Sequence, residues 1–380
     1  MRVLFASSPA LGHAFPMVPL AWALRASGHD VLFATSAGGL QVQRAGLPVA
    51  DLTPPGFDLD AALEQLKQVR PDLYARMHAV QTERQTDVRD AVDYFGETAG
   101  FDTPALLEVA GGWRPDLIVG SFLDGAGLAV AAKLGLPYVR HNADLGRTTG
   151  IDELFRHHMA PVFDQLGIDG LPARRVTLDV APPSAVEVAE DEWPMRCVPY
   201  NGSGVLPDWL LPTGDRPRVA VTLGSIVPGY EGLGKAAEII GAAAEVDADF
   251  VVALGEADAA ELGTTPANVR IAGWVPLTAL LPTCQAIVHH GGGGTTMSAL
   301  SAGVPQLVVT GGAGRNVNAL ALAARGAALV PDDGVVTTAL IRQALEDETL
   351  RKTALDIAAE MATMPSPNEV AGRLVTFATR

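Results

Sequence analysis

Four consecutive glycines between a histidine and a threonine give this sequence its clearest chemical signal. The run Gly291–Gly294 lies between His290 and Thr295. Apolar residues before it predict a buried strand over Ala286–His290, and the pattern after it predicts a helix over Thr295–Ala302. A strand, a tight glycine turn and a helix start leave backbone N–H groups pointing outward, beside the positive end of the helix dipole. Such an arrangement is typical of a phosphate site, although a glycine run can also serve only to pack a strand against a helix.

The overall composition limits the partners that such a site would serve. The 380 residues include 27 basic and 43 acidic side chains, which gives a net charge of −16, and no basic cluster is longer than Arg174-Arg175. Nucleic acid and anionic membranes are therefore poor partners, and a polyanionic ligand must be bound locally by backbone donors, His or Ser. Cys197 and Cys284 are too few and too far apart to indicate a disulfide framework or a thiolate metal site.

The sequence shows no signal for export or for membrane insertion. Its N-terminus is apolar only as far as Ala6 before Ser7, Ser8 and Pro9 follow, which indicates a buried strand. No run of about eighteen apolar residues occurs. We therefore expect a soluble, cytoplasmic protein.

The N-terminal half predicts alternating strands and helices. A strand over Arg2–Ala6, a helix over Pro16–Ser27 and a strand over Val31–Ala34 form a βαβ unit. The turn Ser7–Gly12 lacks G-x-G-x-x-G, so it carries no dinucleotide fingerprint. The pattern continues with further predicted elements: helices Leu59–Val69, Pro71–Gln81 and Asp87–Phe95, strand Pro115–Gly120, helix Ala126–Leu134 and strand Pro137–His141.

A proline- and glycine-rich stretch, Tyr200–Pro217, interrupts this pattern and is predicted as an interdomain linker. The alternation then restarts, with strands Val219–Leu223, Phe250–Leu254, Val269–Ala272, Ala286–His290 and Gln306–Val309, and helices Leu233–Ala244, Thr278–Leu281, Thr295–Ala302 and Asn316–Arg325, before a final helical pair. The fold class is therefore α/β, with two doubly wound Rossmann-like domains that face each other across a cleft.

Four sequence blocks make a known family recognisable. They are GHAFPMVPLAWALRASGHDV, RPRVAVTLGS, AGWVPLTALLPTC and HHGGGGTTMSALSAGVPQLV, and the last two at this spacing are the most specific. Over nearly its whole length the chain resembles the GT-B glycosyltransferases of family 1 type, specifically the actinomycete enzymes that transfer deoxysugars from nucleotide donors to polyketide antibiotics. It looks most similar to those for enediynes, angucyclines and related aromatic polyketides.

The resemblance implies that the second domain binds the nucleotide donor. It places the donor diphosphate on the second histidine of the HHGG motif, on nearby glycine amides and on two hydroxyls, and the base of the nucleotide on the WVP motif. The implied donor-binding residues are Ser225, Trp274, Val275, His290, Gly293, Gly294 and Thr295. His289 is expected to be structural.

The resemblance also implies the catalytic residues. His13 matches the catalytic histidine of GHxxP, which removes the acceptor proton during inverting transfer. Relatives support that histidine with a carboxylate, but Ser121 stands at the usual acidic position. Asp124 is the nearest carboxylate and is the candidate substitute.

A second departure concerns the donor sugar. Many relatives hold its hydroxyls with an Asp-Gln pair, whereas this chain has Gly314 and Arg315 at those positions. Fewer acceptor groups suit a deoxygenated sugar, or Arg315 reaches the diphosphate. Asn316 and Asn318 are candidates to take over part of the role.

Two D-x-D sequences raise the question of a metal ion. Asp58 with Asp60 opens a predicted helix, and Asp247 with Asp249 precedes a predicted strand, neither beside the glycine run. We expect both pairs to be structural and the leaving-group charge to be met by a helix dipole and side chains.

These observations lead to one hypothesis for the whole chain. Residues 1–205 bind the acceptor, 206–217 link, 218–365 bind the donor, and 366–380 form a helix that packs back on the N-terminal domain. The predicted activity is hexosyltransferase-type: inverting, metal-independent and cofactor-free transfer of a deoxysugar from a TDP-sugar to a large apolar polyketide-type aglycone. The expected acceptor wall comprises Phe57, Tyr74, Met77, Asp144 and Phe155. Carbon–carbon glycosylation of an aromatic ring and a non-catalytic auxiliary role stay open, as does homodimerisation.

Overall fold

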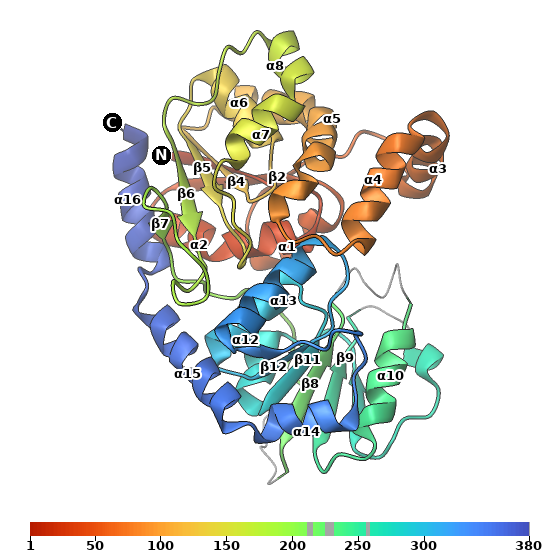
Figure 1. Ribbon diagram of the computed structural model, residues 1–380. Coiled ribbons are helices and arrows are strands. Elements are labelled where there is room, and N and C mark those ends of the chain that lie inside the picture. Colours follow the sequence, from red (N-terminus) through yellow and green to blue (C-terminus); the bar gives the residue numbers. More distant parts are fainter. Residues whose placement is uncertain (211–215, 225–231, 256–258, 380) are drawn as a thin grey trace.

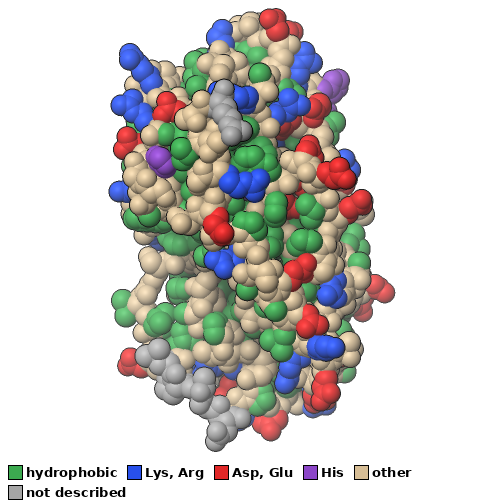
Figure 2. All heavy atoms as spheres, turned by 90° about the vertical axis from the view of Figure 1, so that its left-hand side faces the viewer, with side chains coloured by type: hydrophobic (Ala, Val, Ile, Leu, Met, Phe, Trp, Pro, Cys, Tyr) green, Lys and Arg blue, Asp and Glu red, His purple; other side chains and the backbone are tan. Residues whose placement is uncertain are grey.

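The computed structural model describes the chain except for residues 211–215, 225–231, 256–258 and 380, and it shows two parallel α/β sheets (Figure 1). This confirms the predicted fold class. No helix in the described ranges is long and apolar enough to cross a membrane. On the face in Figure 2, acidic and basic side chains are interspersed among apolar ones.

The N-terminal domain is built on a seven-stranded sheet in the order β3-β2-β1-β4-β5-β6-β7. All of its paired strands are parallel, so their carboxyl ends lie at one edge. The strands are β1 (Arg2–Ala6), β2 (Asp30–Thr35), β3 (Val49–Asp51), β4 (Leu117–Ser121), β5 (Tyr138–His141), β6 (Arg175–Asp179) and β7 (Trp193–Pro194).

Both faces of this sheet are covered by apolar core. From Val3 to Ala6, successive side chains of the central strand β1 are all apolar and point to opposite faces. Val3 and Phe5 of β1 enter one core, whereas Leu4 and Ala6 enter the other. The helices of this domain are α1 (Leu11–Ala14), α2 (Val18–Ala26), α3 (Leu59–Val69), α4 (Pro71–Thr82), α5 (Val92–Trp113), α6 (Ala126–Leu134), α7 (Ile151–His158) and α8 (Ala160–Leu166), with 3-10 turns at Phe15–Met17, Ala37–Ala45 and Val88–Ala91.

The C-terminal domain repeats this plan on a six-stranded parallel sheet in the order β10-β9-β8-β11-β12-β13. Its strands are β8 (Arg218–Thr222), β9 (Asp249–Ala253), β10 (Val269–Ala272), β11 (Ala286–His289), β12 (Gln306–Val308) and β13 (Ala328–Leu329). Its helices are α10 (Gly234–Ala243), α11 (Leu277–Leu280), α12 (Gly293–Ala302), α13 (Ala313–Arg325), α14 (Thr338–Glu346) and α15 (Glu348–Thr363), with 3-10 turns at Asp208–Leu210, Ala259–Leu262 and Leu281–Thr283.

The two domains share apolar core. One cluster of buried side chains includes Phe5 of β1, Met297 of α12 and Leu322 of α13, and it extends to Met361 of α15. The last helix, α16 (Pro367–Thr379), packs on α2 and lies beside the N-terminal sheet (Figure 1). The boundary between the sheets is therefore a packed interface.

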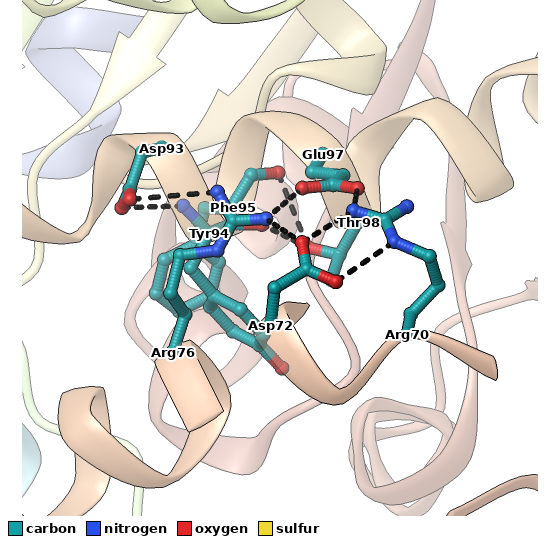
Figure 3. Close-up of polar contacts among 8 residues, drawn as sticks. All are labelled: Arg70, Asp72, Arg76, Asp93, Tyr94, Phe95, Glu97 and Thr98. Carbon is teal, nitrogen blue, oxygen red and sulfur yellow. Dashed lines mark hydrogen bonds and ion pairs between the residues drawn. The ribbon is translucent and has the colours of Figure 1, made fainter. Parts of the chain in front are cut away.

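Helices α3 and α4 project from the N-terminal domain and are tied to it by charge. Arg70 pairs with Asp72 and Glu97, while Arg76 pairs with Asp72, Glu97 and Asp93 (Figure 3). Asp93 and Glu97 belong to α5, so this network fixes α4 against the body of the domain. Pairs this exposed contribute little individually, and their effect here is orientation.

The structure contains α7, α8, β6 and β7, for which the sequence predicted no element, and it differs at several predicted helix boundaries. Helix α5 runs from Val92 to Trp113 through Pro104, where the sequence predicts a helix that ends at Phe95. Burial of one face of α5 against α6 and α7 outweighs the local propensity of those residues. Helix α12 begins at Gly293, two residues earlier than predicted.

Candidate active site

The glycine run forms a sharp turn between β11 and α12. Gly291 adopts a φ of +85°, and a Cβ there would lie 2.7 Å from the backbone oxygen of Arg315, so only glycine fits. The buried imidazole of His289 shapes the turn, because its Nδ1 accepts a hydrogen bond from the Gly291 amide at 3.1 Å and its Nε2 donates to Gln306 at 2.8 Å. His289 therefore has a structural environment.

His290 points between two glycines. A Cβ at Gly224 would lie 2.5 Å from His290 Cε1, and a Cβ at Gly292 would also clash with the ring. Burial, together with the charge of Arg315 and the neighbouring His289, lowers the pKa of His290 to about 3. Its Nδ1 is buried without a hydrogen-bond partner among the described residues. The chain thus holds a neutral imidazole with unused hydrogen-bonding capacity beside the turn.

The start of α12 is covered on one side and open on the other. A Cβ at Gly293 would collide with the carboxylate of Asp144, whereas a Cβ at Gly294 would meet nothing within 4 Å. Thr295 is buried behind them. An anion would therefore reach the first amides of α12 from the side of Gly294.

Asp144 connects this turn to the N-terminal domain. Its carboxylate accepts a hydrogen bond from Asn318 at 3.1 Å, and Asn318 also donates to the Gly291 carbonyl at 3.0 Å. Asn318 in turn accepts from the Leu145 amide at 3.1 Å. The expectation that Asp144 belongs to the acceptor wall is not matched, because its buried side chain is used in this interdomain contact. Burial raises the pKa of Asp144, although the hydrogen bond from Asn318 acts in the opposite direction.

Trp274 and Val275 occupy different environments although they are adjacent. The indole is 41% exposed, donates from Nε1 to the Asn201 carbonyl at 2.9 Å and lies against Gly202, where a Cβ would be 3.0 Å from Nε1. Val275 is only 8% exposed and packs in a core cluster. The linker thus orients the indole, and Val275 offers a ligand only its backbone. Ser225 lies outside the described residues.

His13 lies in α1, directly after the carboxyl end of β1. Its ring stacks on Phe122 with centroids 4.5 Å apart and meets Phe95 at 5.5 Å. Desolvation lowers the pKa of His13 to about 4, and its Nδ1 is buried with no partner in the described part of the chain. The imidazole is therefore neutral at pH 7, as a proton acceptor must be.

Asp124 does not serve as the missing partner of that histidine here. Its carboxylate accepts one bifurcated hydrogen bond from the Gly127 amide, at 3.0 and 3.2 Å to its two oxygens, and Cβ atoms at Gly120 or Gly127 would collide with it. It therefore points inward at the start of α6, where desolvation raises its pKa to about 6. No hydrogen bond joins Asp124 to His13 Nδ1 among the described residues.

Three residues at the ends of β4 and β5 form a buried polar group that the sequence did not predict as a group. Ser121 pairs in register with His141, and Asn142 follows it. All three are buried, and Ser121 Oγ, His141 Nε2 and Asn142 Nδ2 have no hydrogen-bond partner in the described ranges. His141 Nδ1 donates to the Asn142 carbonyl at 2.7 Å, and burial lowers its pKa to about 4, so Nε2 carries a free lone pair. No local sequence motif signals this group, because it depends on strand register.

The aromatic and sulfur-containing residues expected to form the acceptor wall differ in their exposure to solvent. Phe57 is 48% exposed, and Tyr74 and Met77 on α4 are partly buried. Phe155 is fully buried in the core, where Arg140 lies 5.2 Å from its ring centroid. Phe155 therefore cannot line a ligand surface, and this expectation is wrong because aromatic character alone does not report burial.

Arg315 makes an interdomain contact that the sequence did not predict. Its Nη2 donates to the Gln81 carbonyl of the N-terminal domain at 2.6 Å, and the neighbouring Asn316 donates to the Gln85 carbonyl at 2.9 Å. The residue thus reaches across the domain boundary. Its charge is nevertheless close enough to His290 to lower the pKa of that imidazole.

The D-x-D sequences lie away from the turn. Asp58 caps α3 by accepting from the Ala61 amide, and Asp247 and Asp249 pair with Arg216 at 2.9 Å. These contacts agree with the structural roles expected for the three residues. A hollow of about 480 Å³ beside Arg216 lies at this same end of the sheet, away from the glycine turn.

Comparison with known proteins identifies the family. Residues 22–224 match the N-terminal domain, and residues 237–377 the C-terminal domain, of Erythromycin biosynthesis protein CIII-like proteins. The elloramycin glycosyltransferase ElmGT of Streptomyces olivaceus is 41% identical over 99% of this chain and 97% of its own length.

Solved structures give the same result. The glycosyltransferase SnogD from Streptomyces nogalater is 40% identical, with a TM-score of 0.84 over 100% of this chain and 99% of its own. The spinosyn rhamnosyltransferase SpnG, solved with spinosyn aglycone and with thymidine diphosphate, is 30% and 29% identical in these two structures, with TM-scores of 0.83 and 0.82 over 99% of this chain and 100% of its own. The chain belongs to the Erythromycin biosynthesis protein CIII-like family and is a GT-B glycosyltransferase of antibiotic biosynthesis.

Proposed function

We propose that this enzyme transfers a deoxysugar from a TDP-sugar, bound by the C-terminal domain, to a polyketide-type aglycone bound by the N-terminal domain. The observation that carries the proposal is the meeting of the two sheets. His13 follows β1 and His290 follows β11. The loop after β5, which leaves the same edge of the N-terminal sheet as the loop after β1, touches the turn after β11 where Asp144 covers Gly293. We therefore assign one neutral imidazole from each domain to this boundary, in keeping with relatives solved with thymidine diphosphate and with an aglycone.

The donor diphosphate is assigned to the start of α12. The open amide end at Gly294, the helix dipole and the unpartnered imidazole of His290 supply donors without any basic cluster. The exposed indole of Trp274, held by Asn201, offers a stacking surface for the base of the nucleotide. Ser225 and Thr295 remain proposed hydroxyl contacts.

The proposed reaction needs one proton transfer and one displacement. The His13 imidazole takes the proton of an acceptor hydroxyl while its oxygen attacks the anomeric carbon from the face opposite the diphosphate, so the configuration inverts. The bond from carbon to diphosphate breaks, and TDP leaves with its charge met by α12 and His290. Because His13 Nδ1 is enclosed, Nε2 is the atom assigned to the proton.

We propose that this transfer needs no metal ion. Among the described residues, no group of three or more His, Cys, Asp or Glu side chains has metal-binding geometry. The carboxylates of Asp58, Asp247 and Asp249 are used elsewhere, at caps and ion pairs. A helix dipole and neutral hydrogen-bond donors are the features present at the glycine turn itself.

The acceptor is assigned to the carboxyl end of the N-terminal sheet. Phe57, Tyr74 and Met77 supply apolar surface, in keeping with a large flat aglycone. Buried Ser121 and His141 supply unused polar atoms that match a hydroxyl group.

The pH dependence of kcat/KM tests the assignment of the base. A neutral imidazole is required, and burial has moved the pKa of His13 from 6.5 to about 4. We therefore expect kcat/KM to stay flat as the pH falls through 6.5 and to drop only as it approaches about 4. The measurement is a pH profile of initial rates, with far-UV circular dichroism at each pH to confirm folding. An acid limb centred near 6.5 in folded protein would contradict the assigned environment.

Calorimetric titration with TDP separates an enzyme from a non-catalytic relative. The proposal requires saturable binding of TDP without added metal, and weaker binding of ADP if Trp274 and the Val275 backbone read the base. A protein with no affinity for TDP is not a donor-using transferase.

A further inference from the structure

Arg315 and Asn316 at the start of α13 fasten a segment of the other domain. The segment Gln81–Gln85 follows the body of α4, and its carbonyls at Gln81 and Gln85 accept hydrogen bonds from Arg315 at 2.6 Å and Asn316 at 2.9 Å. A third hydrogen bond has its donor in the N-terminal domain, where Arg84 donates to the Asp332 carbonyl at 3.3 Å. Three hydrogen bonds with donors on both sides therefore join positions about 230 to 250 residues apart.

Gly312 allows this approach. A Cβ there would lie 2.7 Å from the Thr82 amide nitrogen and would collide with the backbone carbonyl of Gln81. The φ of −61° and ψ of 167° at Gly312 suit any residue, so the glycine is required by the neighbouring backbone and not by its own conformation. Two residues along the same helix start, a Cβ at Gly314 would meet nothing within 4 Å.

The fastened segment lies beside the proposed diphosphate site. The charge of Arg315 acts on His290, and the Arg315 carbonyl is the group that excludes a side chain at Gly291. A second interdomain contact, from Asp144 to Asn318 and on to the Gly291 carbonyl, holds the other side of the turn. The turn is therefore enclosed between two contacts from the N-terminal domain.

We propose that Arg315 and Asn316 are positioning residues that clamp Gln81–Gln85 over the diphosphate end of the donor site, so that TDP leaves only after the clamp opens. Arg315 acts through the backbone of Gln81 and does not bind phosphate itself. This inference rests on the proposed function for the identity of the nucleotide. The clamp itself rests on the contacts across the boundary.

The test compares Gly312→Ala, Arg315→Ala and the matched control Gly314→Ala. Gly312→Ala wedges the Gln81 backbone away while it retains Arg315. TDP dissociation is followed by stopped-flow through tryptophan fluorescence, and opening of residues 81–87 is followed by hydrogen–deuterium exchange without ligand. We expect Gly312→Ala and Arg315→Ala to accelerate both TDP dissociation and exchange by about tenfold, the effect of losing one or two hydrogen bonds, while Gly314→Ala behaves as wild type.

Two outcomes overturn the clamp. If Arg315→Ala alone accelerates TDP dissociation and Gly312→Ala does not, Arg315 is a direct phosphate ligand. If exchange in residues 81–87 is equal in all variants, the segment is not held by these contacts. A wild-type protein that binds no TDP contradicts the proposed function instead, and the exchange experiment still decides the clamp.

Discussion

Replacement of His13 by alanine is expected to lower kcat by about 10²-fold or more, the usual contribution of a general base. The ring contacts Phe122 and Phe95 and is neutral at pH 7, and the proposed mechanism assigns the acceptor's proton to it. Affinity for TDP should change little, because the nucleotide is assigned to the other domain. Steady-state kinetics with saturating donor, together with TDP calorimetry, measure the two effects separately.

The control for this variant is His157→Ala. His157 is exposed on α7, and its loss should leave kcat and TDP affinity unchanged. Thermal unfolding of both variants checks that the cavity left between Phe122 and Phe95 has not unfolded the protein. Wild-type turnover by folded His13→Ala would remove the basis of the proposed mechanism.

Replacement of His290 by alanine should affect both chemistry and donor binding. We expect kcat to fall by about 10²- to 10³-fold, the cost of removing one donor that stabilises developing charge. TDP affinity should fall as well, since the imidazole is enclosed by Gly224 and Gly292 and its Nδ1 is unused in the described structure. Rates with a TDP-sugar and calorimetry with TDP provide the two readouts.

His290→Asn provides the matched comparison, because its amide restores a hydrogen-bond donor with less volume and no basicity. It should recover part of the TDP affinity that His290→Ala loses. Equal TDP affinity in wild type and His290→Ala would place the diphosphate away from this imidazole. The turn itself should persist in both variants, because His289 shapes it through Gly291 and Gln306.

The sequence predicted most accurately the strands and helices whose apolar residues follow a regular pattern. The bounds of β1, β10, α3 and α6 were predicted as they are observed. Each has either a short apolar run or an amphipathic pattern that ends at a clear stop, as α6 does at Gly135 in the left-handed conformation.

Predictions from the sequence were wrong where contacts between distant segments determine the length of a helix or the burial of a side chain. The central part of α5 contains glycine and proline, yet its buried face keeps it helical through Pro104. Phe155 has the same aromatic character as Phe57, but only the fold shows that it is enclosed by the core. Residue type predicts neither result.

The same distinction applies to the site residues: local features were predicted from the sequence, whereas contacts between distant segments were not. The strand–turn–helix around Gly291 is local, so the order of its elements was predicted from the sequence, although α12 begins two residues earlier than predicted. The contact of Asp144 with Asn318, and that of Gln81 with Arg315, join distant segments and appear only when the two sheets meet. The alignment of Ser121 with His141 depends on the register of β4 and β5, which no motif encodes.

The most direct test of the proposed mechanism is the anomeric configuration of the product formed in the presence of EDTA. Purified enzyme would be incubated with TDP-deoxysugars and polyketide aglycones, and the glycoside found by mass spectrometry would be analysed by NMR. The mechanism predicts undiminished product with an inverted anomeric centre, released together with TDP. Product formed only when a divalent metal is restored, or with a retained configuration, would contradict it.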